Sequence, residues 1–251
     1  MTTENRLKGR IALVTGATRG IGRAVALALA GEGAHVIICG RTAGALEELD
    51  DAIRAKGGTA TLLHLDLRRG ERVDQIGPTL YSRWGKLDIV VACAGILGPL
   101  SPLAHVTEDA WAAVLQINLT ANWHLIRTLD PLLRRSDAGR AVFVSSGTNT
   151  VTGKKAYWGP YAVSKAGLEV LARTYAHEVA GTPVRVNIVN PGPVRTGMRA
   201  KAYPGEDPAL LPPPEDVAPL FLELASPDCT ANGELFHFRE WRAKRPAPVG
   251  S

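Results

Sequence analysis

The sequence alternates short apolar runs of strand type with longer segments of helical periodicity, and this alternation constrains the fold more than any other feature. Strands separated by helices form a parallel sheet that helices cover on both faces. The expected strands are 10–15, 34–39, 59–65, 87–92, 141–145, 184–189 and 233–238. We therefore predict an α/β fold with a Rossmann-like, doubly wound parallel sheet of about seven strands.

The expected helices are 23–32, 42–56, 69–84, 107–133, a helix that begins near Pro160, and 215–225. The pair Gly77-Pro78 is expected to break or bend the helix 69–84, and Thr107 to cap the helix that follows it. Residues 195–214 are rich in proline, glycine and charge and predict a flexible flap, whereas residues 239–251 predict an irregular tail. Since linkers and internal repeats are absent from the sequence, we expect one domain over residues 1–251.

Composition narrows the class of protein. The chain has 251 residues, of which 45% are hydrophobic, enough for a substantial core. It lacks a run of 18 apolar residues and has a polar start that leads straight into a strand, so we expect neither a membrane span nor a signal peptide. The spacing of Cys39, Cys93 and Cys229 suits neither disulfides nor a metal site, and the six histidines suggest no metal either. A cytoplasmic protein without metal is predicted.

The net charge of +5 is spread along the chain, apart from a basic tail that holds Arg239, Arg242, Lys244 and Arg245. Nucleic-acid binding favours a concentrated basic patch with interleaved aromatic residues. We therefore expect no nucleic-acid partner, while a modest positive bias suits an anionic cofactor.

A glycine-rich run, Thr15-Gly16-Ala17-Thr18-Arg19-Gly20-Ile21-Gly22, joins the first expected strand to the first expected helix. Glycines permit a tight turn and let the backbone approach a pyrophosphate, while the helix that follows offers free N–H groups to an anion. Spaced glycines alone are weak evidence. Their place between a strand and a helix predicts a dinucleotide-binding loop.

Polar residues and glycines also follow other expected strands at their carboxyl ends, where open parallel sheets bind ligands. They are Asp66, Gly95, Ser145-Ser146 and Asn190-Pro191-Gly192. Loop chemistry alone explains this concentration poorly, so we expect the functional site at this edge.

Tyr161 and Lys165 are four residues apart on the helix that begins near Pro160, and therefore share one face. A free tyrosine has a pKa of about 10, and a nearby ammonium favours the phenolate. The spacing thus predicts a tyrosine with a lowered pKa, suited to proton transfer near neutral pH. Such a pair is more often two surface neighbours; the glycine-rich loop favours the catalytic interpretation.

Together these motifs resemble the short-chain dehydrogenase/reductase family over about residues 7–235. The resemblance rests on Thr15-Gly16-x-x-x-Gly20-Ile21-Gly22, Tyr161-x-x-x-Lys165, Asn118, Ser146, and Asn190-Pro191-Gly192 with Thr196. The run 157–165 is most similar to a bacterial branch of that family. The resemblance implies hydride transfer between a nicotinamide cofactor and a small carbonyl compound or alcohol, by a homo-oligomer, either dimer or tetramer.

The resemblance also implies roles for individual residues. Tyr161 is the acid–base group, Lys165 lowers its pKa and contacts the nicotinamide ribose, Ser146 steadies the substrate oxygen and Asn118 holds a water. Asp66 contacts the adenine amine, and Leu67 adds a backbone contact. The other cofactor contacts are Gly16, Thr18, Arg19, Gly20, Ile21, Gly22, Arg41, Ala94, Gly95, Pro191, Gly192, Val194 and Thr196, together with Tyr161 and Lys165. Thr196 is equally suited to capping a helix.

The chain departs from the family pattern in three places. Ser146 precedes Tyr161 by fifteen residues, slightly more than usual, so the segment 147–159 must bulge, and Ser145 or Thr148 is an alternative source of the hydroxyl. The run Ala92-Cys93-Ala94-Gly95 lacks the asparagine that stabilises the sheet in the family. We therefore expect the chain to be less rigid at this point. The tail 236–251 lacks the usual glycine-rich ending and says little about an oligomer interface.

An NAD site needs a carboxylate about 20 residues after the glycine loop. Gly40 stands there instead, and Arg41 follows it. Arg19 and Arg41 together suit a 2′-phosphate, which guanidinium groups bind in bidentate fashion, although each alone is more often a solvated surface residue. We predict NADP(H), with NAD(H) as the alternative.

The substrate pocket is expected to contain Ile96, Leu97, Trp158, Met198 and Tyr203. These residues favour an apolar or aromatic carbonyl compound, although core packing explains them almost as well, and the segment 195–214 is expected to close over the pocket. An NAD-linked alcohol dehydrogenase and a non-catalytic NADP-binding regulator are the alternative functions. The intact Tyr161, Lys165 and Asn118 favour an enzyme.

Overall fold

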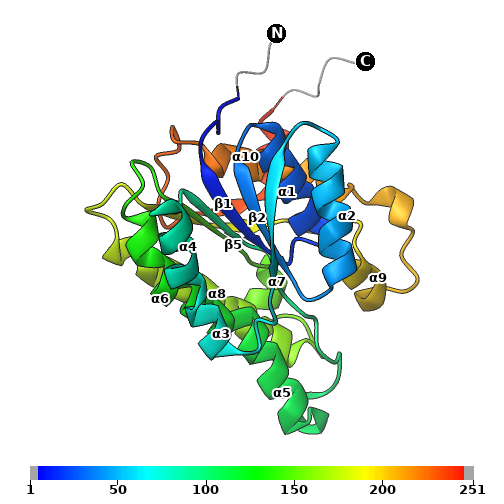
Figure 1. The fold of residues 1–251 in the computed structure, drawn as a ribbon. Coiled ribbons are helices and arrows are strands. Elements are labelled where there is room, and N and C mark those ends of the chain that lie inside the picture. The colour runs from blue at the N-terminus through cyan, green and yellow to red at the C-terminus, as the bar shows by residue number, and fades with distance from the viewer. Residues whose placement is uncertain (1–4, 246–251) are drawn as a thin grey trace.

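Seven parallel strands form one sheet in the order β3-β2-β1-β4-β5-β6-β7 (Figure 1). The structure, a computed structural model, describes residues 5–245 except the side chains of Thr148 and Asn149. The strands are β1 (Ile11–Thr15), β2 (His35–Gly40), β3 (Thr59–His64), β4 (Ile89–Ala92), β5 (Arg140–Val144), β6 (Arg185–Asn190) and β7 (Leu235–His237). The chain builds the sheet outwards from β1 in one direction and then from β4 in the other. The predicted doubly wound, Rossmann-like fold is confirmed.

Helices connect the strands and cover both faces of the sheet. The first half holds α1 (Gly20–Gly31), α2 (Ala43–Arg54), α3 (Gly70–Asp74), α4 (Ile76–Trp84), the 3-10 turn η1 (Leu103–His105), α5 (Glu108–Leu115), the π turn η2 (Gln116–Thr120) and α6 (Ala121–Leu133). The second half holds α7 (Thr148–Val151), α8 (Gly159–Glu178), α9 (Gly197–Ala202), the 3-10 turn η3 (Pro208–Leu210), α10 (Pro214–Ala225) and α11 (Phe238–Ala243). Among residues 5–245, none of these helices has the length and apolar character needed to cross a bilayer.

Alternate residues of each strand enter two separate cores, one on each face of the sheet. In β2, Val36 and Ile38 pack with α1, α2 and α10, whereas Ile37 and Cys39 pack on the opposite side with α4, α6 and α8. Figure 1 shows these two helix layers on either side of the strands. Since strand side chains alternate between faces, strands buried on both faces must be apolar throughout, as the sequence pattern indicated.

The helix expected over 69–84 is divided, but not at Gly77-Pro78. It is interrupted at Gln75, and both residues lie in the first turn of α4. A proline is tolerated there because the first N–H groups of a helix have no partner within it. A side-chain carbon on Gly77 would lie 2.3 Å from the Thr128 carbonyl oxygen, so this glycine instead allows α4 to pack closely on α6.

The segment expected as one helix over 107–133 contains three parts. Thr107 caps α5 as predicted, since its hydroxyl accepts a hydrogen bond from the Ala110 N–H (3.3 Å). The π turn η2 then separates α5 from α6 and contains Asn118. π turns inside helices occur often at functional sites.

Two segments expected to be irregular contain helices. Residues 195–214 include α9 and η3, because the polar residues there cap turns: Thr196 caps α9 and Asp207 caps η3. The tail prediction was wrong for residues 239–243, which lie in α11, where the Trp241 indole N–H donates to Glu223 of α10 (3.0 Å). Residues 246–251 of that prediction lie outside the described chain.

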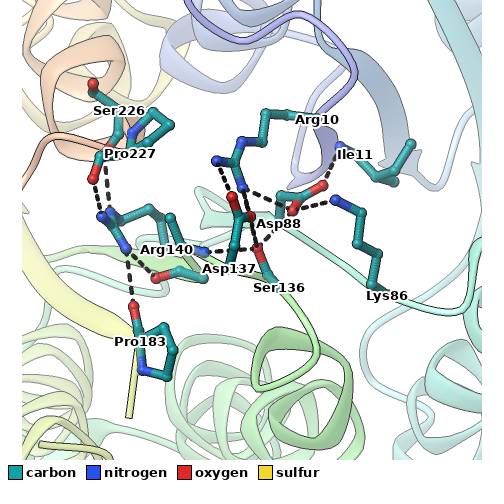
Figure 2. Close-up of polar contacts among 12 residues, drawn as sticks. Arg10, Ile11, Lys86, Asp88, Ser136, Asp137, Arg140, Pro183, Ser226 and Pro227 are labelled. Atoms are coloured by element: carbon teal, nitrogen blue, oxygen red, sulfur yellow. Dashed lines mark hydrogen bonds and ion pairs between the residues drawn. The ribbon is translucent and has the colours of Figure 1, made fainter.

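A polar network closes the amino edge of the sheet, where β1, β4 and β5 begin (Figure 2). Asp88 is fully buried there and accepts hydrogen bonds from Arg10 Nη1 (3.0 Å), Lys86 Nζ (2.9 Å), Ser136 Oγ (2.6 Å) and the Ile11 N–H (2.9 Å). Burial raises the pKa of Asp88, but the hydrogen bonds from Ser136, Ile11 and Lys86 lower it by more, so its pKa lies below the usual value.

Arg140, at the start of β5, is the second buried charge of this edge (Figure 2). Its guanidinium donates to the backbone carbonyls of Ser226 (2.9 Å), Gly139 (2.8 Å), Pro183 (3.1 Å) and Pro227 (2.5 Å). The side chain thereby links β5 to the chain before β6 and to the end of α10.

Candidate active site

The glycine loop between β1 and α1 depends on glycine at three positions. Gly16 and Gly20 have φ angles of +63° and +54°, which glycine adopts without strain. A side-chain carbon on Gly16 would lie 2.8 Å from Ala94 Cα, and one on Gly22 would lie 2.3 Å from the Gly16 carbonyl oxygen. The loop therefore packs backbone against backbone, and the amino end of α1 opens beside it. This geometry suits a pyrophosphate.

The residue that precedes α1 leaves the end of this helix free for a ligand. Arg19 is its N-cap and forms no side-chain capping bond, and the first turn carries no acidic residue. Thr196 lies against the same loop: a side-chain carbon on Gly20 would lie 3.3 Å from Thr196 Cγ2. The structure thus brings the predicted Thr18–Gly22 segment together with the loop after β6.

Gly40 explains why the usual acidic residue is missing at the end of β2. A side-chain carbon on it would lie 2.7 Å from Thr18 Cγ2 and 3.3 Å from Leu46 Cδ2. A side chain at position 40 would therefore have to displace the Thr18 methyl group.

Two arginines follow the residues that meet at this contact: Arg19 follows Thr18, and Arg41 follows Gly40. Arg19 and Arg41 are exposed, and neither takes part in the ion pairs of the described chain. Unpaired guanidinium groups next to a glycine loop are suited to a phosphate.

Asp66, at the end of β3, has a partner that the sequence did not suggest. Arg68 donates to both carboxylate oxygens, from Nε (2.9 Å to Oδ2) and from Nη2 (2.5 Å to Oδ2), with a longer bond to Oδ1 (3.1 Å). These hydrogen bonds lower the pKa of Asp66 and outweigh its partial burial, and the charge of Arg41 adds to the effect. The adjacent Leu67 is buried. Arg68 was missed because a basic residue at a strand end is usually a solvated one.

Asn118 holds the loop after β4 from inside the protein. Its Oδ1 accepts from the Ile96 N–H (2.8 Å), and its Nδ2 donates to the Ile96 carbonyl (2.9 Å) and to Ser164 Oγ (3.0 Å). A side-chain carbon on Gly95 would lie 3.3 Å from Asn118 Oδ1 and 3.7 Å from Lys165 Nζ. Gly95, Asn118 and Lys165, predicted separately, therefore meet in one place.

The family asparagine that Ala92-Cys93-Ala94-Gly95 lacks has a local substitute. The buried hydroxyl of Thr15 accepts a hydrogen bond from the Ala94 N–H (3.2 Å), and this bond ties the end of β1 to the end of β4. Cys93, in the same loop, is a free thiol whose pKa burial raises to about 12.

Tyr161 and Lys165 lie on one face of α8, both buried, with Lys165 Nζ 5.9 Å from the centre of the Tyr161 ring. The ammonium donates to the carbonyl of Val144 at the end of β5 (2.7 Å), and burial lowers its pKa to about 8. The predicted lowering of the Tyr161 pKa is not found. Burial raises that pKa, and a side-chain hydrogen bond from Ser146 offsets only part of the rise.

Ser145, Ser146 and Thr148 are the candidates for the hydroxyl that binds the substrate oxygen. Glu169, one turn after Lys165, distinguishes between the two serines. Ser145 Oγ donates to the buried carboxylate of Glu169 (2.6 Å), which also binds Arg173 (3.2 Å). The Ser146 side chain interacts with the Tyr161 phenol instead. The side chain of Thr148 lies outside the described part of the structure.

The loop after β6 has a defined shape. Asn190 Oδ1 accepts from the Gly192 N–H (3.0 Å), and Gly192 has a φ of +68°. Pro191 and Val194 are buried, while Thr196 Oγ1 accepts from the Arg199 N–H (3.2 Å). The capping interpretation of Thr196 is therefore confirmed, and it is compatible with a cofactor contact.

A cavity of about 310 Å³ opens beside Ser146. Its lining comprises Ser146, Gly147, Thr150, Lys155, Trp158, Gly192, Pro193 and Arg199. A neighbouring cavity of about 410 Å³ shares Arg199 and includes Tyr203, Glu206 and Leu211. Trp158 and Tyr203 thus lie where the sequence predicted, and the Trp158 ring meets the Tyr161 ring edge-on at 5.7 Å.

Three predicted pocket residues, Ile96, Leu97 and Met198, line neither cavity among the described residues. Lys155 and Arg199 line the first one and were missed. The sequence contained a signal for Lys155. The segment 147–159, which precedes Tyr161, was expected to bulge, and it contains two lysines.

Comparisons with known proteins identify the family of the chain and its fold. The model of the short chain dehydrogenase family matches residues 10–207. The oxidoreductase YciK of Escherichia coli K12 is 38% identical over 228 residues, which cover 90% of this chain and 89% of that protein. Two similar structures are a short chain dehydrogenase of Shigella flexneri 2a strain 301 in complex with NADP (37% identity, TM-score 0.87) and one of Escherichia coli CFT073 in complex with NADPH (37% identity, TM-score 0.88). Each alignment covers 94% of this chain and 99% of the other.

Proposed function

The chain belongs to the short-chain dehydrogenase family, and on that premise we propose that it is an NADP(H)-dependent oxidoreductase that interconverts a carbonyl compound and an alcohol. Tyr161 is the acid–base group of this reaction, Ser146 binds the substrate oxygen, and Lys165 and Asn118 support proton movement.

One arrangement supports this function most directly. The buried Tyr161 phenol interacts with the Ser146 hydroxyl, which lines a cavity at the carboxyl edge of the sheet, next to the glycine loop. We propose that a carbonyl oxygen bound at Ser146 accepts a hydrogen bond from each of the two hydroxyls. The two donors stabilise the negative charge that develops on this oxygen as the carbonyl carbon is reduced.

The pKa of Tyr161 suits proton donation. Because burial raises it, the phenol keeps its proton at neutral pH, which is the form that carbonyl reduction requires. Alcohol oxidation requires the phenolate, so we expect oxidation to be favoured at higher pH than reduction.

Lys165 and Asn118 can return a proton to Tyr161. One of the three ammonium donors of Lys165 goes to Val144, which leaves two for a water, a ribose or the phenol. Both N–H donors of the Asn118 amide are used by Ile96 and Ser164, so the Asn118 backbone carbonyl, which already accepts from Asn122 Nδ2 (2.8 Å), is the group that can hold a water.

The residues present fit NADP(H). The glycine loop and the end of α1 would hold the pyrophosphate, Arg19 and Arg41 the 2′-phosphate, Asp66 and Leu67 the adenine, and the 190–196 loop the nicotinamide. Ala94 and Gly95 border the same space. The nicotinamide supplies or takes up the hydride. Two structural relatives in complex with NADP or NADPH support this cofactor over NAD(H).

Further properties belong to the proposal. The continuous sheet supports a single domain, and the exposed apolar side chains of Trp123, Val163 and Val170 on α6 and α8 support a homo-oligomer. The segment 195–214 contributes residues to both cavities, and we propose that it acts as the flap. The cytoplasmic location stays a prediction from sequence.

A panel of aromatic and aliphatic aldehydes and ketones, monitored by the absorbance of the reduced cofactor, tests this function. We expect NADPH oxidation with at least one member of the panel and a much lower kcat/KM with NADH. A protein that binds NADPH but reduces none of them, and oxidises none of the corresponding alcohols, would instead be the non-catalytic regulator.

A further inference from the structure

The cavity beside Ser146 has a positively charged wall. Lys155, in the segment between α7 and α8, and Arg199 of α9 both line it, and acidic side chains are absent from its described lining. A substrate bound at Ser146 occupies the same cavity as these two cations.

Arg199 has its own counter-ion. Glu206 accepts from Arg199 Nε (2.5 Å) and Nη2 (2.6 Å), and the guanidinium carbon lies 3.7 Å from the centre of the Tyr203 ring. A bidentate pair of this kind uses both oxygens of the carboxylate. The charge of Arg199 is therefore balanced by a residue of the same wall.

Lys155 has no such counter-ion. Among the described residues, none of the carboxylates lies within ion-pair distance of its ammonium, which donates to the Tyr203 hydroxyl and lies 3.8 Å from the centre of the Trp158 ring and 4.8 Å from that of Tyr203. The aromatic faces hold this cation without neutralising it. Lys155, Arg199 and Glu206 together leave one positive charge on the wall, and two of the three ammonium donors of Lys155 have no acceptor in the described part of the structure.

We propose that the substrate is a carbonyl compound with an apolar or aromatic body and a single carboxylate, and that Lys155 binds this carboxylate. This inference rests on the proposed function. One unbalanced positive charge matches a monoanion, and the flanking rings of Trp158 and Tyr203 match an apolar or aromatic body. Lys155 is a residue of substrate specificity, since it lines the cavity beside the Trp158 ring and is not one of the groups assigned to proton transfer.

A matched pair of substrates tests this inference: 4-carboxybenzaldehyde and its neutral methyl ester, methyl 4-formylbenzoate. The wild-type protein with NADPH is expected to show a higher kcat/KM for the carboxylate. In Lys155→Met the ratio of the two kcat/KM values should fall by about 10- to 100-fold, as for the loss of a charge-assisted hydrogen bond, mostly through KM for the carboxylate. Lys155→Arg should restore most of the preference.

Lys154→Met is the matched control. Lys154 is the neighbouring residue, is exposed and lines neither cavity, so its removal changes the net charge equally but should keep the ratio. If Lys155 served only to hold the α9 segment against the segment before α8, Lys155→Met would impair both substrates alike. An unchanged ratio, or a wild type that prefers the ester, would overturn the inference and leave the proposed function intact.

Calorimetry of 4-carboxybenzaldehyde binding to the NADP⁺-loaded protein distinguishes failure of the anion site from failure of the proposed reductase activity. Binding that depends on Lys155, without turnover of these two aldehydes or of any member of the carbonyl panel, would refute the reductase and retain the anion site. Turnover of the ester alone would refute the anion site and retain the reductase.

Discussion

The two edges of the sheet bury charged groups in different ways. At the amino edge, Asp88 has four hydrogen-bond donors and Arg140 has four carbonyl acceptors, all from this chain (Figure 2). At the carboxyl edge, the ammonium of buried Lys165 has one acceptor among the described residues, the Val144 carbonyl, while Arg19, Arg41 and Lys155 have no carboxylate partner there.

This difference separates structural charges from functional ones. A buried charge whose partners are all internal contributes to holding strands together, and an outside molecule finds no free group on it. A buried or cavity-lining charge with unused donors is suited to binding a ligand. Substitutions at the amino edge should therefore reduce stability, whereas substitutions at the carboxyl edge should reduce catalysis or ligand binding.

Asp88→Asn should have the largest effect, and on stability. It leaves Arg10 and Lys86 without their buried partner, which costs about 3 to 5 kcal/mol of unfolding free energy. Urea unfolding followed by circular dichroism at neutral pH measures this loss, while kcat of the folded fraction stays unchanged. The control is Asp137→Asn, because the Asp137 side chain also binds Arg10 but is 77% exposed, and should cost less than about 1 kcal/mol. Equal losses in the two variants would mean that Asp88 is not the centre of the network.

Ser146→Ala should mainly affect catalysis. Loss of a hydrogen-bond donor to the developing oxyanion lowers kcat by about 100- to 1000-fold. Ser145→Ala removes an identical hydroxyl one residue away, but one that donates to Glu169, and should lower stability by about 1 kcal/mol with a much smaller loss of kcat. The reverse ranking of the two kcat values would assign the catalytic hydroxyl to Ser145.

The double substitution Arg19→Ala and Arg41→Ala should weaken NADPH binding by about 10- to 100-fold, since two charge-assisted contacts to the 2′-phosphate are lost from exposed groups. NADH, which lacks that phosphate, serves as the internal control. Titration of nicotinamide fluorescence with both cofactors measures the two Kd values. Equal weakening of NADH and NADPH would remove the basis for the NADP preference.

Lys165 provides a pH-dependent test of burial. Its folded pKa, about 8, lies below the ordinary lysine value, so the unfolded chain binds the proton more tightly and the cost of burying the charge is fully present below pH 8. This cost is relieved as the pH rises from 8 towards the unfolded pKa. From pH 7 to pH 9.5, the stability of the wild type relative to Lys165→Met should therefore increase by about 2 kcal/mol. A pH-independent difference between the two proteins would contradict a buried, titrating ammonium.

Local patterns were enough to predict much of this molecule. The glycine loop, the fold class and the pairing of Tyr161 with Lys165 follow from strand and helix periodicity and from a four-residue spacing. The Thr107 and Thr196 caps were likewise apparent because a cap interacts only three residues away.

Other features depend on contacts between distant segments. That Ser145 donates to Glu169, and that Thr18 excludes a side chain at Gly40, requires knowledge of how α8 and the glycine loop pack. The π turn at Asn118 interrupts a segment whose sequence is helical throughout. The Tyr161 pKa was mispredicted because spacing reports the nearby cation but not the burial, and here burial has the larger effect.

Tyr161 is the proposed proton donor beside a bound dinucleotide, and Tyr161→Phe tests this role most directly when turnover and cofactor binding are measured on one preparation. We expect NADPH-dependent carbonyl reduction to fall by about 1000-fold or more, with a Kd for NADPH close to that of the wild type, since only the phenolic hydroxyl is removed. Retention of full turnover by Tyr161→Phe would contradict the account.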